Sequence, residues 1–164
     1  MIEYPLNHQP GSVPDNVAQI PFFQKLAPEI IDEMLSSITI LDCEAGDIII
    51  EEGVMERDLL FLLKGEVRIQ KDNSTIETAS GSGDLLGEIA LLKDGQRTAT
   101  IVAETQVYCL KVKQKFLDGL ATDVRSAYYA AMYRFLAELL ARRLDTTSEK
   151  LANAEKKLAE LQGS

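Results

Sequence analysis

The side chains best suited to chemistry lie in residues 87–100, where Glu88 precedes Arg97 by nine positions. The Arg97 guanidinium can make a charge-assisted, bidentate contact to phosphate oxygens. Thr98 adds a hydroxyl donor beside it. Glu88 can accept a hydrogen bond from a ligand hydroxyl while Arg97 offsets its charge. These residue types indicate a pocket for a phosphate ligand that also carries a hydroxyl group.

Glycines lead into this stretch at positions 81 and 83. We expect a short helical turn over residues 85–91 that aims free backbone N–H groups at an anion. A charge-assisted hydrogen bond contributes about 1.5 to 3 kcal/mol net, so Arg97 with such a cradle would dominate phosphate binding. Because a Glu and an Arg at this spacing more often form a surface ion pair, the interpretation depends on the whole stretch.

Catalytic chemistry finds little support in the sequence. His8 is the single histidine and lies in an irregular N-terminal segment. The two cysteines, Cys43 and Cys109, are far apart in segments that resemble strands, so they fit buried free thiols better than a metal site. No Ser or Cys nucleophile has a base nearby in sequence. We therefore expect neither an enzyme nor a metal site.

The elements that must position Glu88 and Arg97 are strands. From residue 38 to residue 112, short β-branched runs alternate with turn residues at intervals of about 6 to 12 positions. This rhythm predicts a jelly-roll-like antiparallel β-barrel. Short helices are expected over residues 15–37, with Pro28 as a first helical residue. The predicted fold class is mainly β with flanking helices.

The C-terminal part reads as helix throughout. Residues 113–120 fit a short helix, and Thr122 or Asp123 caps a long final one. A heptad seam runs along it at positions spaced alternately four and three apart, apolar except for one threonine: Tyr133, Ala137, Leu140, Leu144, Thr147, Leu151, Ala154, Leu158 and Leu161. Such a seam predicts a parallel coiled-coil homodimer through residues 133–161. The alternative is that the stripe folds back on the barrel.

Three regions follow: an N-terminal arm (1–15), a barrel with short flanking helices (16–121) and a dimerisation helix (122–164). We expect a cytoplasmic protein, because no apolar run reaches the roughly 18 to 20 residues of a membrane span and no secretion signal is visible. The net charge of −9 disfavours nucleic acid and anionic membranes as partners. Any anion must be held by a local pocket.

The run Gly-Glu-Ile-Ala-Leu-Leu at 87–92, followed by Arg-Thr-Ala at 97–99, closely resembles the phosphate-binding cassette of cyclic nucleotide-binding domains. Residues 46–49, 52–53 and 60–67 are similar to that family's early strands and glycine turns. The resemblance implies an eight-stranded jelly roll in which Arg97 takes the phosphate and Glu88 the ribose. The implied ligand-binding set there is Gly87, Glu88, Ile89, Ala90, Arg97, Thr98 and Ala99.

Residues 141–150 are similar to the central dimer helix of the catabolite activator family, in which a Thr-Ser pair reaches the adenine. The resemblance implies that Thr147 and Ser148 touch the base, which favours cyclic AMP as the ligand and leaves cyclic GMP possible. The heptad pattern independently puts Thr147 on the seam. The alternative there is a threonine that sets register or oligomeric state.

Two departures from the activator family are visible. The spacing from Glu88 to Arg97 is one residue shorter, and the chain ends at Ser164, where that family continues into a helix-turn-helix domain. We expect no DNA-reading element in this chain, and whether the chain is a truncation stays open. The predicted function is a cyclic AMP receptor domain. The alternatives are a cyclic GMP-selective receptor and a non-binding structural dimerisation module, and the downstream effector is unknown.

Overall fold

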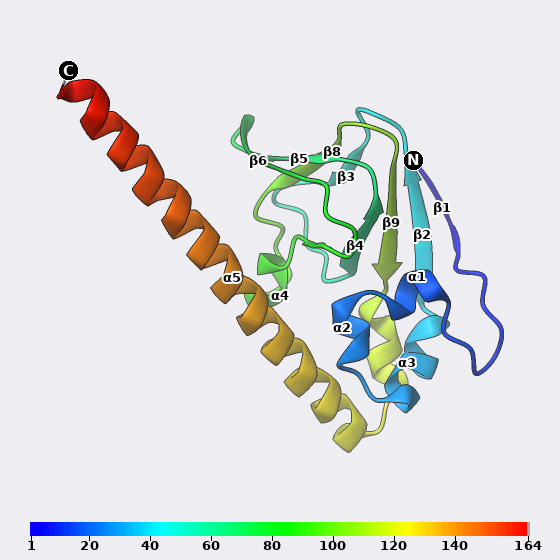
Figure 1. Ribbon diagram of the computed structural model, residues 1–164. Helices are drawn as coiled ribbons and strands as arrows, with labels where there is room; N and C mark the ends of the chain where they lie inside the picture. The colour runs from blue at the N-terminus through cyan, green and yellow to red at the C-terminus, as the bar shows by residue number, and fades with distance from the viewer. Residues whose placement is uncertain (164) are drawn as a thin grey trace. The chain divides into compact units, whose positions relative to one another are not determined.

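The computed structural model describes residues 1–163, and its first unit, Met1–Arg125, is built on two antiparallel sheets (Figure 1). One sheet has the order β1 (Ile2–Pro5), β2 (Ile38–Cys43), β9 (Val107–Val112), β4 (Leu59–Lys64) and β7 (Leu85–Leu86). The other has the order β3 (Ile48–Ile50), β8 (Thr100–Ala103), β5 (Val67–Lys71) and β6 (Ser74–Ala79). Strands β2 to β9 form the expected jelly roll, so the predicted fold class is confirmed.

The core is made by the inward faces of the strands. In both β2 and β9 the first, third, fourth and sixth residues are buried and the second and fifth are half-buried, so both faces of these strands are largely covered. Cys43 and Cys109 lie in this core as free thiols, as the sequence predicts. Desolvation by burial raises the pKa of Cys43 to about 11 and that of Cys109 to about 12, so both are protonated at neutral pH.

The N-terminal segment begins as a strand, since β1 pairs antiparallel with β2. Glu3 accepts a hydrogen bond from Thr39 Oγ1 at 2.8 Å and pairs with Lys113 Nζ at 2.8 Å. The α-amino group of Met1 pairs with Asp47 at 2.8 Å. The sequence does not predict a strand within the N-terminal arm over residues 1–15, and this strand extends the first sheet by one member.

Three short helices precede the barrel: α1 (Asp15–Ala18), α2 (Pro21–Gln24) and α3 (Pro28–Leu35). Pro28 is the first residue of α3, as predicted. Phe22 and Phe23 from α2 meet Phe61 of β4, with the three ring centroids mutually 5.6 Å apart. These rings join the helices to the sheet.

After β9 the chain forms a 3-10 helix, η1 (Gln114–Gly119), and then the long helix α5 (Thr122–Gln162). Thr122 is the first residue of α5 rather than a cap outside it. The second unit is Ser126–Ser164, and the last residue of the predicted 122–164 helix, Ser164, lies outside the described residues. Across residues 1–163, no helix is both long enough and apolar enough to span a membrane.

Candidate functional site

The candidate site begins where β7 ends. Gly87 has φ +71°, a conformation that favours glycine, and turns the chain from β7 into α4 (Ile89–Leu92). The helical turn is shorter than the predicted one over 85–91, because Leu85 and Leu86 pair with Phe61 and Leu60 of β4. A four-residue helix has a weak dipole, so the case for anion binding rests on side chains rather than on this helix.

The chain returns from α4 to Arg97 through a second tight turn. Asp94 and Gly95 have φ values of +52° and +87°, and the Gly95 N–H donates to Ala90 O at 2.8 Å. Two backbone hydrogen bonds then hold Arg97 in place. Its N–H donates to Val54 O at 2.9 Å, and its carbonyl accepts from Gly53 N–H at 2.8 Å. Residues 53–56 therefore set the position of Arg97.

Arg97 is 2% exposed, which is rare for an arginine. Its Nη1 donates to Gly87 O at 3.2 Å, and its Nη2 donates to Asp58 O at 2.7 Å and to Glu56 Oε2 at 3.2 Å. Its Nε is buried with no hydrogen-bond acceptor anywhere in residues 1–163. Because burying an unpaired donor is costly, this N–H is suited to an oxygen of a bound ligand.

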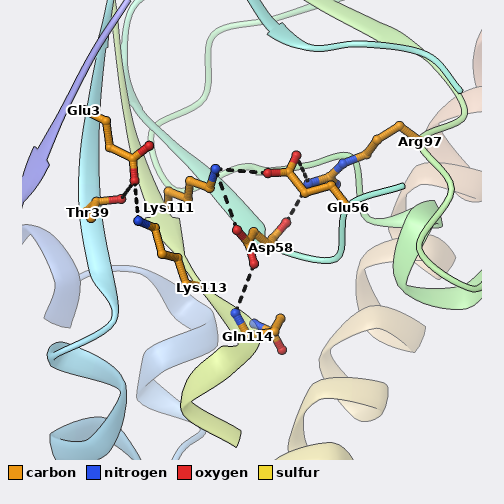
Figure 2. A network of polar contacts seen from close by, with 8 residues as sticks. All are labelled: Glu3, Thr39, Glu56, Asp58, Arg97, Lys111, Lys113 and Gln114. Carbon is orange, nitrogen blue, oxygen red and sulfur yellow. Dashed lines mark hydrogen bonds and ion pairs between the residues drawn. The ribbon is translucent and has the colours of Figure 1, made fainter. Parts of the chain in front are cut away.

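A network of charges continues from Arg97 toward β9 (Figure 2). Lys111 Nζ lies 3.0 Å from Glu56 Oε1 and 3.7 Å from Asp58 Oδ2. Burial acts to raise the pKa of Glu56, but the hydrogen bond and charge of Lys111, followed by Arg97, outweigh it and hold that pKa below its ordinary value. Asp58 also accepts the Gln114 N–H on Oδ1 at 3.1 Å, at the start of η1.

Glu56, Asp58 and Lys111 were not identified from the sequence. The available signals were two acidic residues immediately before an apolar strand and one lysine inside the buried strand Val-Tyr-Cys-Leu-Lys-Val. Neither signal says which residues meet. The register that pairs Lys111 with Leu60, two residues after Asp58, brings them together.

Among the predicted ligand-binding residues, the structure brings Gly87 and Arg97 into direct contact. Glu88 is 6% exposed at the start of α4, and Ala90 is also buried. Ile89 is exposed, and Thr98 and Ala99 are half-buried. Thr147 and Ser148 are exposed residues of α5 in the second unit. The binding roles of all these residues stay predictions.

The two sheets and Arg97 define a jelly-roll domain with a buried arginine next to the turn at Gly87. The chain belongs to the cyclic nucleotide-binding domain family, whose model matches residues 40–123. The resemblance in the sequence is thus confirmed. This is a regulatory and not a catalytic family, so the prediction that the chain is not an enzyme is confirmed as well.

Individual relatives support the same family. The chain is 34% identical over 93 residues to the human potassium/sodium hyperpolarization-activated cyclic nucleotide-gated channel 4, covering 57% of this chain and 8% of the channel. It is 30% identical over 96 residues to a cyclic nucleotide-gated potassium channel of Rhizobium etli, covering 58% of this chain and 26% of that one. It thus matches only a small part of each channel.

Among solved structures, the Thermus thermophilus catabolite activator protein superposes with a TM-score of 0.59 at 27% identity. The match covers 80% of this chain and 61% of that chain.

Proposed function

We propose that this chain is a cyclic nucleotide receptor domain whose ligand is cyclic AMP. The observation that carries the proposal is the Arg97 side chain, buried beside Gly87 with a free Nε–H. A phosphodiester oxygen supplies both the negative charge and the acceptor that this donor lacks. The channel relatives are named as cyclic nucleotide-gated, which agrees with this ligand class.

The remaining roles follow from chemistry. Gly87, Ile89 and Ala90 offer backbone groups to the phosphate, and Thr98 with Ala99 lies beside Arg97. Glu88 is a buried carboxylate that accepts the ribose 2′-hydroxyl. An analogue without this hydroxyl loses that hydrogen bond and binds more weakly. The preference for cyclic AMP over cyclic GMP rests on Thr147 and Ser148 alone.

The dimer belongs to the same proposal. Leu144, Leu151, Leu158 and Leu161 of the seam are 55% to 75% exposed on α5. Exposed leucines at heptad spacing favour burial against the same helix of a second copy. We propose a homodimer through residues 133–161, and sedimentation of the purified chain tests it. A monomer at all accessible concentrations would contradict it.

Ligand binding is proposed to reach α5 through Asp58. The carbonyl of this residue holds Arg97, and its carboxylate holds the first residue of η1, which leads directly into α5. A shift of the Arg97 guanidinium toward the phosphate would therefore displace Asp58 through their hydrogen bond. Asp58 in turn holds Gln114 at the start of η1. Spatial continuity is not coupling, so the effect of ligand on dimerisation is measured in Asp58→Ala, which removes the acceptor of the Gln114 N–H. We expect that effect to be lost in this variant.

Calorimetry tests the receptor function. The wild type is titrated with cyclic AMP, cyclic GMP and 2′-deoxy cyclic AMP, beside Arg97→Ala and Arg97→Lys. We expect Arg97→Ala to lose at least about tenfold in affinity, since a charge-assisted hydrogen bond is worth about 1.5 to 3 kcal/mol. Arg97→Lys keeps the charge but loses the planar fork, so it recovers only part of the affinity. No heat and no thermal shift at millimolar ligand would refute the proposal.

A further inference from the structure

The Arg97 guanidinium is not ready for a bidentate contact as it stands. An oxyanion that meets Nε side-on also needs an N–H of Nη2, since these two nitrogens point along one edge of the guanidinium. Nη2 has two hydrogens, and both are engaged, one by Asp58 O and one by Glu56 Oε2. A phosphate that binds side-on must therefore displace one of these two acceptors.

The two acceptors differ in how firmly they bind Arg97 Nη2. Asp58 O is a backbone carbonyl at 2.7 Å, in a residue whose carboxylate is itself bound by the Gln114 N–H. Glu56 Oε2 is a side-chain atom at 3.2 Å, and the Glu56 side chain is 30% exposed. Glu56 is the acceptor that can move away.

Glu56 also pairs with a second cation, Lys111. Its Oε1 is 3.0 Å from Lys111 Nζ, shorter than the distance from its Oε2 to Arg97. Lys111 contributes more than Arg97 to the lowered pKa of Glu56. When Arg97 turns to another anion, Glu56 is left paired with Lys111 rather than as an uncompensated, half-buried charge.

We propose that the Glu56 carboxylate competes with the ligand phosphate for Arg97, and that Lys111 determines how readily Glu56 releases Arg97. This inference rests on the proposed cyclic nucleotide function and names the residues that set the affinity of that site. The Glu56 carboxylate occupies one donor of Arg97 and partly neutralises its charge. Lys111 is a positioning residue that acts through Glu56 and does not touch the ligand.

The size of the effect follows from Coulomb's law. If the removed charge and the phosphate are taken to be roughly 7 Å apart, with an effective dielectric constant of about 40, between the values for a protein surface and bulk water, the affinity changes about sevenfold. Screening by salt over a Debye length of about 8 Å reduces this somewhat. Glu56→Gln keeps an amide oxygen that can still accept from Arg97, so the change is one of charge rather than of packing.

The test is a double-mutant cycle of Glu56→Gln, Lys111→Met and the double variant, with the dissociation constant for cyclic AMP measured by calorimetry. We expect Glu56→Gln to bind about three- to tenfold more tightly. Lys111→Met should bind about three- to tenfold more weakly, because Glu56 then holds Arg97 alone. Lys111→Met should weaken binding much less in the Glu56→Gln background than in the wild type, since the part of its effect that acts through Glu56 is gone and only its pair with Asp58 remains.

Glu104→Gln is the matched control, because Glu104 also pairs with an arginine, Arg68, and its side chain is 35% exposed. It removes the same charge from the chain without touching Arg97, so its affinity should equal that of the wild type.

The outcomes separate the inference from the receptor function. If the wild type binds cyclic AMP and Glu56→Gln binds it no more tightly, the inference is wrong and the receptor function stands. The same holds if Lys111→Met changes the affinity equally in the wild-type and Glu56→Gln backgrounds. Absence of cyclic AMP binding by both the wild type and Glu56→Gln overturns the receptor function and the inference with it. Binding by Glu56→Gln only would overturn the receptor function of the wild type and support the inference that Glu56 occupies Arg97.

Discussion

Replacing Gly87 with alanine perturbs both the backbone turn and the arginine beside it. Gly87 has φ +71°, and an added Cβ would lie 2.7 Å from Arg97 Nη1 and 2.9 Å from Ile50 Cδ1. Ordinary van der Waals contact begins at 3.4 Å, so the guanidinium must retreat by 0.7 Å, the difference between 3.4 and 2.7 Å. The 3.2 Å hydrogen bond from Nη1 to Gly87 O is strained by the same movement.

The expected loss can be worked from these contacts. A residue with a Cβ in the left-handed region costs roughly 1 to 2 kcal/mol. Losing the hydrogen bond to Gly87 O adds about 1 kcal/mol. Gly87→Ala should therefore lower the free energy of unfolding by about 2 to 3 kcal/mol. A displaced Arg97 should also weaken cyclic AMP binding at least about tenfold, which corresponds to 1.4 kcal/mol.

Gly46→Ala is the matched control. Gly46 has φ +95°, and an added Cβ there meets nothing within 4 Å. It should lose only the backbone part, roughly 1 to 2 kcal/mol, with cyclic AMP binding intact. Urea unfolding gives the stabilities and calorimetry gives the affinities. Equal destabilisation of the two variants, together with wild-type affinity in Gly87→Ala, would refute the reasoning.

Three further predictions concern the seam, the aromatic contact and the thiols. Leu151→Asp should make the chain sediment as a monomer, because it puts a charge on the seam. A Leu151→Asp variant that still sediments as a dimer would contradict dimerisation through the seam. Phe61→Ala should cost about 3 to 5 kcal/mol in urea unfolding, since Phe61 is fully buried against Phe22 and Phe23, whereas exposed Tyr4→Ala should cost little. Cys43 and Cys109 should resist a thiol reagent until the protein unfolds. Because burial raises the pKa of Cys43 from 9.0 to about 11, its contribution to stability is complete below pH 9 and lost as the pH rises through that range. Rapid labelling of Cys43 or Cys109 in the native protein would contradict the prediction that both thiols are buried.

The barrel was predictable because its strands are short, β-branched and separated by turn residues. The long helix was predictable from an uninterrupted heptad pattern. The strand β1 was not, because its four residues are all exposed and end in Pro5, so they show no alternation. It forms because β2 offers an unpaired edge, and Glu3 adds contacts to Thr39 and Lys113.

Part of the site was also predictable. Gly87, Glu88 and Arg97 lie in one short stretch, so their types and spacing carry the signal. Glu56 and Lys111 lie 55 positions apart in the sequence and meet only because β4 and β9 pair in a particular register. Such long-range ion pairs depend on tertiary packing, which no local pattern encodes.

The most direct test of the account is the Nε–H resonance of Arg97 in a nitrogen-15 correlation spectrum of the arginine side chains. The Arg97→Lys variant identifies the resonance by its loss. We predict a signal protected from solvent exchange that moves on titration with cyclic AMP as the Nε–H gains a phosphate acceptor, and that stays in place with adenosine. A resonance that stays in place while cyclic AMP saturates the protein would contradict the claim that Arg97 holds the phosphate.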